Sequence, residues 1–244
     1  MGTKPGERKL QILQTLAEML QNPKGERITT AALAARLEVS EAALYRHFAS
    51  KAQMFEGLIE FIESSLFSVI NTIQGEQQSG IKQVELIMAL LLGFAQRNRG
   101  LTRVPIGDSL VNEDDRLQTR INQLIDRCEA ALKQALRIAV TGNELLLSPE
   151  DIGSAANMLM CYIVGRWNQF AKSGFVRDPM AQWASQWPML CAACLSQPVV
   201  SSTGPPPVGV AFLLIARASQ AIAQRAGPRF ARRGHVRQRG SRAA

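Results

Sequence analysis

Apolar residues recur at every third or fourth position through most of residues 8–195, and this spacing places them on one face of an α-helix. A clear example is the stripe Leu117, Ile121, Leu124, Cys128, Ala131 and Ala135. No segment shows the alternation of apolar and polar residues, bounded by turn residues, that is typical of β-strands. The sequence therefore predicts an all-α fold.

Three serines mark the beginnings of predicted helices. Ser40 and Ser50 each precede a helical pattern, and their hydroxyls can accept the backbone N–H groups that a helix start leaves without a partner. Ser148 is followed by Pro149 and two acidic residues, an order that is typical of a first helical turn. Helices are therefore expected from residues 41, 51 and 149.

Pattern and composition divide the chain into three parts. Residues 1–51 contain short helices, and residues 52–196 contain longer helical patterns that we expect to form a regulatory and dimerisation domain. Residues 197–244 contain a proline run, eight Arg and no Asp or Glu, and we expect this tail to be disordered. The tail is interpreted either as an aberrant end of the reading frame or as a basic arm that binds DNA phosphates without sequence preference.

The net charge of +8 comes from that tail, because the eight Arg account for it and leave residues 1–196 balanced. Within the balanced part, residues 1–51 carry eight basic and five acidic groups, a bias that favours nucleic-acid binding. The four cysteines and the absence of a leader predict a reduced, cytoplasmic setting. The apolar runs are too short for a membrane span.

A helix-turn-helix is predicted between Thr29 and Ser50. A short helix is followed by a turn at Glu38, and Ser40 then caps a second helix of about nine residues. Base contacts are expected from the first turn of this second helix and from the start of the short helix, and phosphate contacts from the residues that follow. The residues expected to bind DNA are Thr29, Thr30, Ser40, Glu41, Ala43, Tyr45, Arg46, His47 and Lys51.

The other residues with reactive or metal-binding side chains are interpreted as structural. Cys191 and Cys194 continue the apolar stripe of Trp183 and Trp187, so we interpret them as core residues and not as a redox pair. The acids from Glu113 to Asp115 suit the start of a helix. With two histidines in the chain, one of them in the tail, no metal site, catalytic site or cofactor is expected. An α-helical enzyme remains an alternative without a plausible nucleophile or base.

Residues 28–51, ITTAALAARLEVSEAALYRHFASK, resemble the DNA-binding segment of TetR-type regulators, in which Tyr-x-x-Phe with an adjacent His precedes Ser-Lys. The strings MFEGLIEFIESSL, LLLGFAQRNRGLTR and DRLQTRINQL extend the resemblance to the SlmA family of nucleoid occlusion factors. Two positions depart from that family's pattern. Glu38 occupies a turn position usually held by Gly, and Val69 occupies a position usually held by Arg.

The resemblance implies a homodimer that binds short palindromic DNA sites on the nucleoid and acts on the tubulin-like division protein FtsZ, without a small-molecule effector. It also implies a partner groove with an apolar floor and a polar rim, lined by Phe61, Leu90, Gly93, Arg97 and Asn98. A glycine in mid-helix, as at Gly93, indicates close approach of another helix or of a peptide. The alternative within the TetR family is a repressor whose regulatory domain encloses an effector.

Overall fold

The computed structural model describes residues 5–22, 28–110 and 113–195, and within these ranges the chain forms helices and no strand. The predicted all-α fold is confirmed. The elements are α1 (Pro5–Met19), α2 (Thr30–Arg36), α3 (Glu41–Tyr45), α4 (Lys51–Glu76), α5 (Gly80–Arg97), α6 (Arg99–Thr102), α7 (Asp115–Thr141), α8 (Pro149–Lys172), α9 (Trp183–Leu190) and a final π-helical turn (Cys191–Leu195). The tail predicted for residues 197–244 lies outside the described residues.

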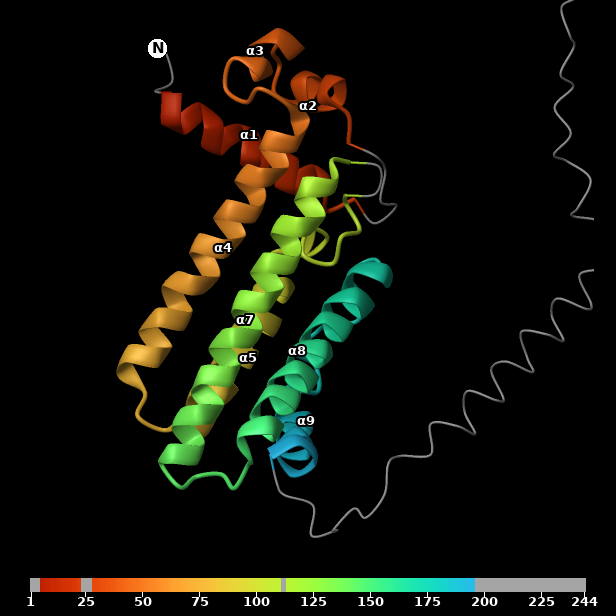
Figure 1. Ribbon diagram of the computed structural model, residues 1–244. Coiled ribbons are helices and arrows are strands. Elements are labelled where there is room, and N and C mark those ends of the chain that lie inside the picture. Colours follow the sequence, from red (N-terminus) through yellow and green to blue (C-terminus); the bar gives the residue numbers. More distant parts are fainter. Residues whose placement is uncertain (1–4, 23–27, 111–112, 196–244) are drawn as a thin grey trace, which may run out of the picture. The chain divides into compact units, whose positions relative to one another are not determined.

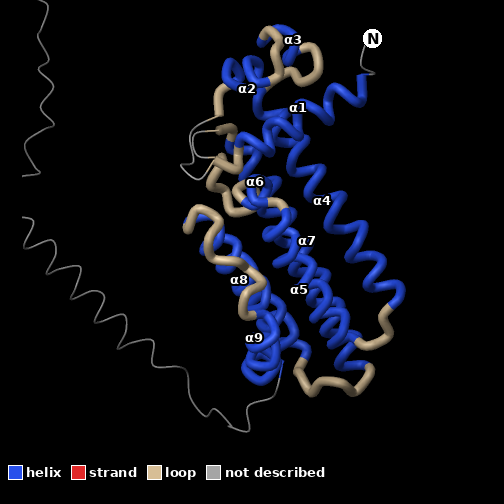
Figure 2. The backbone as a smooth tube through the Cα atoms, turned by 180° about the vertical axis from the view of Figure 1, so that it is seen from behind, coloured by secondary structure: helices blue, strands red, loops and turns tan. Residues whose placement is uncertain are grey.

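The short helices α2 and α3 lie at one end of the described body and α9 at the other, with α4, α5, α7 and α8 running between them (Figure 1). The view from behind shows the same arrangement (Figure 2). Helix α5 packs against α4, α7 and α8, and its Ile87, Met88 and Leu91 are fully buried. Helix α5 is therefore the central helix of the described body. Among the described helices, none is long and apolar enough to cross a bilayer.

The serine caps form where they were predicted. The side chains of Ser40, Ser50 and Ser148 each accept the backbone N–H three residues further on, at 3.3, 3.2 and 3.1 Å. The third helix, however, has five residues instead of about nine. The N–H groups of His47 and Phe48 both bond to the Leu44 carbonyl in a closing turn, and the chain then extends into the cap of α4.

The turn between α2 and α3 holds Glu38 in the left-handed conformation, with φ of 54°. The Glu38 and Val39 N–H groups donate to the carbonyls of Ala35 and Ala34 at 3.1 and 3.0 Å, which is the pattern of a Schellman motif. In this motif the left-handed residue is usually Gly, because a Cβ there costs about 1–2 kcal/mol. The structure thus confirms that Glu38 occupies a left-handed turn position, where Gly would be free of this strain.

Replacement of Glu38 by Gly is expected to raise the free energy of unfolding by about 0.5–1 kcal/mol, because relief of the left-handed strain exceeds the extra chain entropy of Gly. Urea denaturation of the purified protein measures this difference. Glu38→Ala is the control, since Ala keeps the Cβ and loses only the carboxylate. An equal gain in both variants would assign the effect to charge instead of backbone strain.

The start of α5 is held by a carboxylate that lies 64 positions further along the chain, just after α7. Glu144 accepts the N–H groups of Gly80 and Ile81, at 2.9 and 3.0 Å, and the Ser79 hydroxyl at 2.6 Å. The Ser79 hydroxyl, followed by the two backbone N–H groups, lowers the pKa of Glu144 below its ordinary value. The ionised carboxylate therefore stabilises the junction of α5 with the end of α7.

This lowered pKa predicts an acid-dependent loss of stability. The contribution of Glu144 should be complete above its unfolded pKa of about 4.3 and should disappear as pH falls through the lower folded value. Glu144→Gln lacks this titration, so the stability difference between the two proteins should shrink from about pH 5 to about pH 3. Urea unfolding across that range measures it, and a constant difference would contradict the prediction.

Candidate DNA-binding face and partner groove

The predicted DNA-contacting residues form a face at the α2–α3 end of the body. Ser40, Glu41, Tyr45 and Arg46 are exposed, whereas Ala43 and His47 are half-buried. Two apolar residues of this region, Leu44 and Phe48, turn inward and are 1% and 7% exposed. The short α3 is thus anchored on one side and leaves its polar side open to solvent.

The two threonines before and at the start of α2 have different roles. Thr29 is the N-cap, and its Oγ1 accepts the Ala32 N–H at 3.1 Å. The Thr30 hydroxyl instead donates to Oε2 of Glu41 at 2.6 Å. This bond joins the first residue of α2 to the first residue of α3, and sequence spacing did not indicate it.

Lys51, predicted as a phosphate contact, has a protein partner in this structure. Its Nζ lies 2.5 Å from Oε1 of Glu113, and the side chains are 20% and 10% exposed. The ammonium group also lies 5.7 Å from the centre of the Phe55 ring. Lys51 therefore joins the start of α4 to the segment before α7, and its contact with DNA remains a prediction.

A second ionic contact nearby involves Arg103, which is 5% exposed. Its Nη1 donates to Asp108 at 2.5 Å and its Nη2 to the Asn22 carbonyl at 3.1 Å. The guanidinium group lies 5.1 Å from the centre of the Phe175 ring. Arg103 thus connects the end of α1 with the segment after α6 and with the end of α8. The sequence analysis did not single it out, because its partners are distant in sequence.

Two of the five predicted partner-groove residues line one cavity. Phe61, which is 45% exposed, and Asn98 border a hollow of 460 Å³ between α1, α4 and the start of α6. Helix α1 contributes much of its wall, including Leu10 and Leu13, and these residues were missed by the sequence analysis. In α1 both leucines share the three-to-four-residue spacing of the buried residues. The sequence pattern therefore did not distinguish residues that line the cavity from residues of the core.

The other three predicted residues, Leu90, Gly93 and Arg97, lie outside that cavity on α5, at a spacing that places them on one face. An added Cβ at Gly93 would meet only the Arg97 guanidinium, at 3.4 Å. At Gly100, by contrast, an added Cβ would collide with the backbone of α1. Within the described residues, helix packing therefore does not explain the glycine at position 93.

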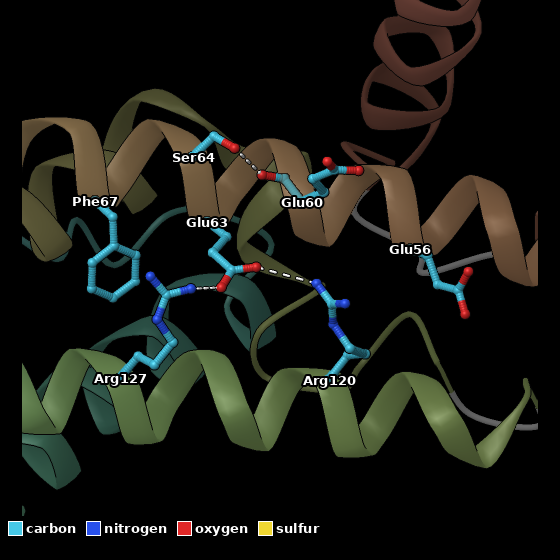
Figure 3. Close-up of a pocket in the computed structure, with 7 residues that line it drawn as sticks. All are labelled: Glu56, Glu60, Glu63, Ser64, Phe67, Arg120 and Arg127. Carbon is cyan, nitrogen blue, oxygen red and sulfur yellow. Dashed lines mark hydrogen bonds and ion pairs between the residues drawn. The ribbon is translucent and has the colours of Figure 1, made fainter.

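A second hollow, of 570 Å³, lies between α4 and α7 and is lined mainly by charged groups (Figure 3). Glu63 sits between two arginines of α7, forming ion pairs with Arg120 at 3.2 Å and with Arg127. The Arg127 guanidinium lies 4.1 Å from the centre of the Phe67 ring. These contacts join α4 to α7 at the surface of the protein. Val69, further along α4, is exposed.

Three of the four thiols, those of Cys128, Cys191 and Cys194, lack the properties of catalytic groups. Burial raises the pKa of Cys128 to about 12 and also raises the pKa values of Cys191 and Cys194. These thiols therefore stay protonated at neutral pH, and a protonated thiol is a poor nucleophile. Among the described residues, no group of three or more His, Cys, Asp or Glu side chains could hold a metal ion.

Comparison with known proteins agrees with this arrangement. Residues 17–58 match the family described as bacterial regulatory proteins, tetR family, and residues 78–194 match the tetracyclin repressor-like C-terminal domain. The solved structure of the fatty acid degradation regulator FadR from Bacillus halodurans superimposes with a TM-score of 0.63 at 13% identity, covering 78% of this chain and 96% of that one. That likeness shows a shared fold.

Close relatives share much more of the sequence. The nucleoid occlusion factor SlmA of Alteromonas mediterranea is 51% identical over 75% of this chain and 94% of its own length. The SlmA protein of a Marinomonas species is 48% identical over 78% of this chain and 96% of its own. This protein is therefore a regulator of the TetR type and not an enzyme. At this level of identity over nearly the whole length of its relatives, the chain belongs to the SlmA family.

Proposed function

We propose that this protein is a nucleoid occlusion factor: a cytoplasmic, nucleoid-associated homodimer that binds palindromic DNA sites and antagonises FtsZ ring assembly over the chromosome. The observation that carries the proposal is the 51% identity to a nucleoid occlusion factor across 94% of that protein's length. The polar face of α2 and α3 supports the DNA-binding part, and the exposed residues of α4 and α5 support the partner-binding part.

In this proposal residues 1–51 bind DNA and residues 52–196 dimerise and bind FtsZ. Tyr45, the last residue of α3, and Arg46, its C-cap, are exposed, so their side chains can reach phosphates beside a groove. The small Ala43 allows the short helix to lie close to the base edges. Two large apolar side chains, Met158 on α8 and Met189 on α9, are exposed. In the proposed dimer, contact with a second copy of the chain would bury them.

The interior of the regulatory helices supports a protein that works without a small-molecule effector. Trp167 is 1% exposed and donates its indole N–H to the Leu91 carbonyl at 3.0 Å, so a large side chain fills the space between α5 and α8. An effector-responsive repressor needs room for its ligand in this layer. Filling of that layer by Trp167 favours nucleoid occlusion over the repressor alternative.

Genome-wide mapping of the bound sites tests the proposal. A nucleoid occlusion factor should occupy many dispersed sites unrelated to promoters, whereas a repressor should occupy one or a few sites beside the genes that it controls. Cells producing the Arg46→Ala variant at the same level are the control, because a lost phosphate contact should weaken binding at all sites together. A single occupied site next to a divergent gene would overturn the proposal.

A further inference from the structure

Glu41 is an unexpected residue on a face that approaches DNA. It is exposed at the first position of α3, the helix proposed to enter the major groove, and Arg46 lies one turn further on. A carboxylate near the phosphate backbone is repelled by it and weakens binding to every sequence. An acid at this position therefore reduces affinity unless it gains a specific contact with a base.

The carboxylate of Glu41 is held in place from the neighbouring helix. The Thr30 hydroxyl donates to its Oε2 at 2.6 Å, which leaves Oε1 able to accept a further hydrogen bond. The caps Thr29 and Ser40 fix the starts of the two helices. The Schellman turn at Glu38 fixes the chain path between them. The position of the Glu41 carboxylate is thus set by the local fold.

We propose that Glu41 reads a cytosine in each half-site and that Thr30 is its positioning residue; this inference rests on the proposed DNA-binding function. An ionised carboxylate only accepts hydrogen bonds, and the cytosine N4 amino group is a donor in the major groove. Guanine N7 and O6 and thymine O4 are acceptors and repel it. The adenine amino group lies between the acceptors N7 and thymine O4, so cytosine is the base that this carboxylate fits best.

The same carboxylate lowers affinity for other sequences. Where no cytosine amino group is present, Glu41 loses water at the groove without gaining a partner, and the phosphates repel it. Specificity then comes from an attractive contact with one base and from repulsion against the others. In a homodimer with two half-sites, the cytosine should occur once in each half and be related by the symmetry of the site.

Selection of bound duplexes from a random pool tests this inference on the full-length protein. The wild-type protein should select cytosine at one position of each half-site, and Glu41→Ala should lose the preference at that position alone. Glu41→Ala should also bind random DNA several-fold more tightly, because a negative charge is removed. Arg46→Ala is the matched control: it should keep the cytosine, bind all sequences more weakly and show a salt slope lower by about one unit.

Two further measurements separate base reading from a purely structural role of the Thr30–Glu41 bond. N4-methylcytosine at the selected position keeps the base pair but blocks the groove-facing amino hydrogen, so it should weaken wild-type binding about 10- to 100-fold and leave Glu41→Ala unaffected. Thr30→Val should reduce the cytosine preference, and Thr30→Ser should restore it.

The outcomes distinguish this inference from the proposed function. If the wild-type protein and a folded Glu41→Ala variant select the same cytosine, or if the modified base has equal effects on both, base reading by Glu41 is wrong. An unchanged preference in Thr30→Val overturns the positioning role of Thr30. A wild-type protein that selects no site at all would instead overturn the proposed DNA-binding function.

Discussion

Replacement of Lys51 by Met is expected to lower the free energy of unfolding by about 2–4 kcal/mol, because it leaves the largely buried Glu113 carboxylate without its cation. The range lies slightly below that of fully buried pairs, since part of Lys51 remains exposed. If Lys51 also reaches a phosphate, the variant should bind all DNA sequences more weakly, with a salt slope lower by about one unit. Urea denaturation and fluorescence anisotropy at several salt concentrations measure the two effects.

Glu113→Gln separates the two roles of Lys51. The Gln side-chain carbonyl can still accept a hydrogen bond from the ammonium group, so stability should fall less than in Lys51→Met. Affinity for DNA should stay the same or rise, because Lys51 is released from its anionic partner. Opposite effects of the two variants on DNA binding would support a phosphate contact by Lys51. Full affinity and an unchanged salt slope in Lys51→Met would restrict Lys51 to its structural role.

Much of the fold could be predicted from the sequence because its signals are local. A serine cap bonds to a residue three positions away, so Ser50 and Ser148 marked their helix starts without knowledge of the rest of the chain. The buried positions of α7 could also be predicted from local sequence, because the three-to-four-residue spacing of its apolar residues alone places them on one face of the helix. The length of α3 was wrong for a related reason: the Leu44 carbonyl accepts two N–H groups in a closing turn that periodicity does not distinguish from helix.

The candidate site was less predictable because its contacts join distant segments. Lys51 and Glu113 are 62 positions apart, and nothing in either segment indicates the other. Leu10 and Leu13 line the cavity that Phe61 borders, yet in sequence they look like any other apolar helix positions. Which apolar residue reaches the core and which borders a hollow depends on how α1 packs on α4. That packing is a property of the tertiary structure.

Charge placed on the predicted partner-binding face of α5 is expected to remove binding to a peptide from the tail of FtsZ. Leu90→Glu puts a carboxylate at a position predicted to be apolar floor, and Arg97→Asp, on the same face of α5, replaces the cation proposed to meet the peptide's carboxylates or carbonyls. Each variant should weaken binding of an FtsZ tail peptide about 100-fold or more, as expected for central contacts of a small interface. Both residues lie on α5, outside the α2–α3 face, so affinity for DNA should not change.

The test is paired, with peptide binding and DNA binding measured by fluorescence anisotropy on the same preparations and folding checked by circular dichroism. Arg137→Asp is the matched control, because it reverses an exposed charge on α7 outside the proposed groove. This control should bind both peptide and DNA normally, which separates a local contact at Arg97 from a general effect of net charge. Normal peptide binding by folded Leu90→Glu and Arg97→Asp would exclude this face of α5 as the partner site. The cavity between α1 and Phe61 would then be the remaining candidate, since it presents apolar walls from two other helices.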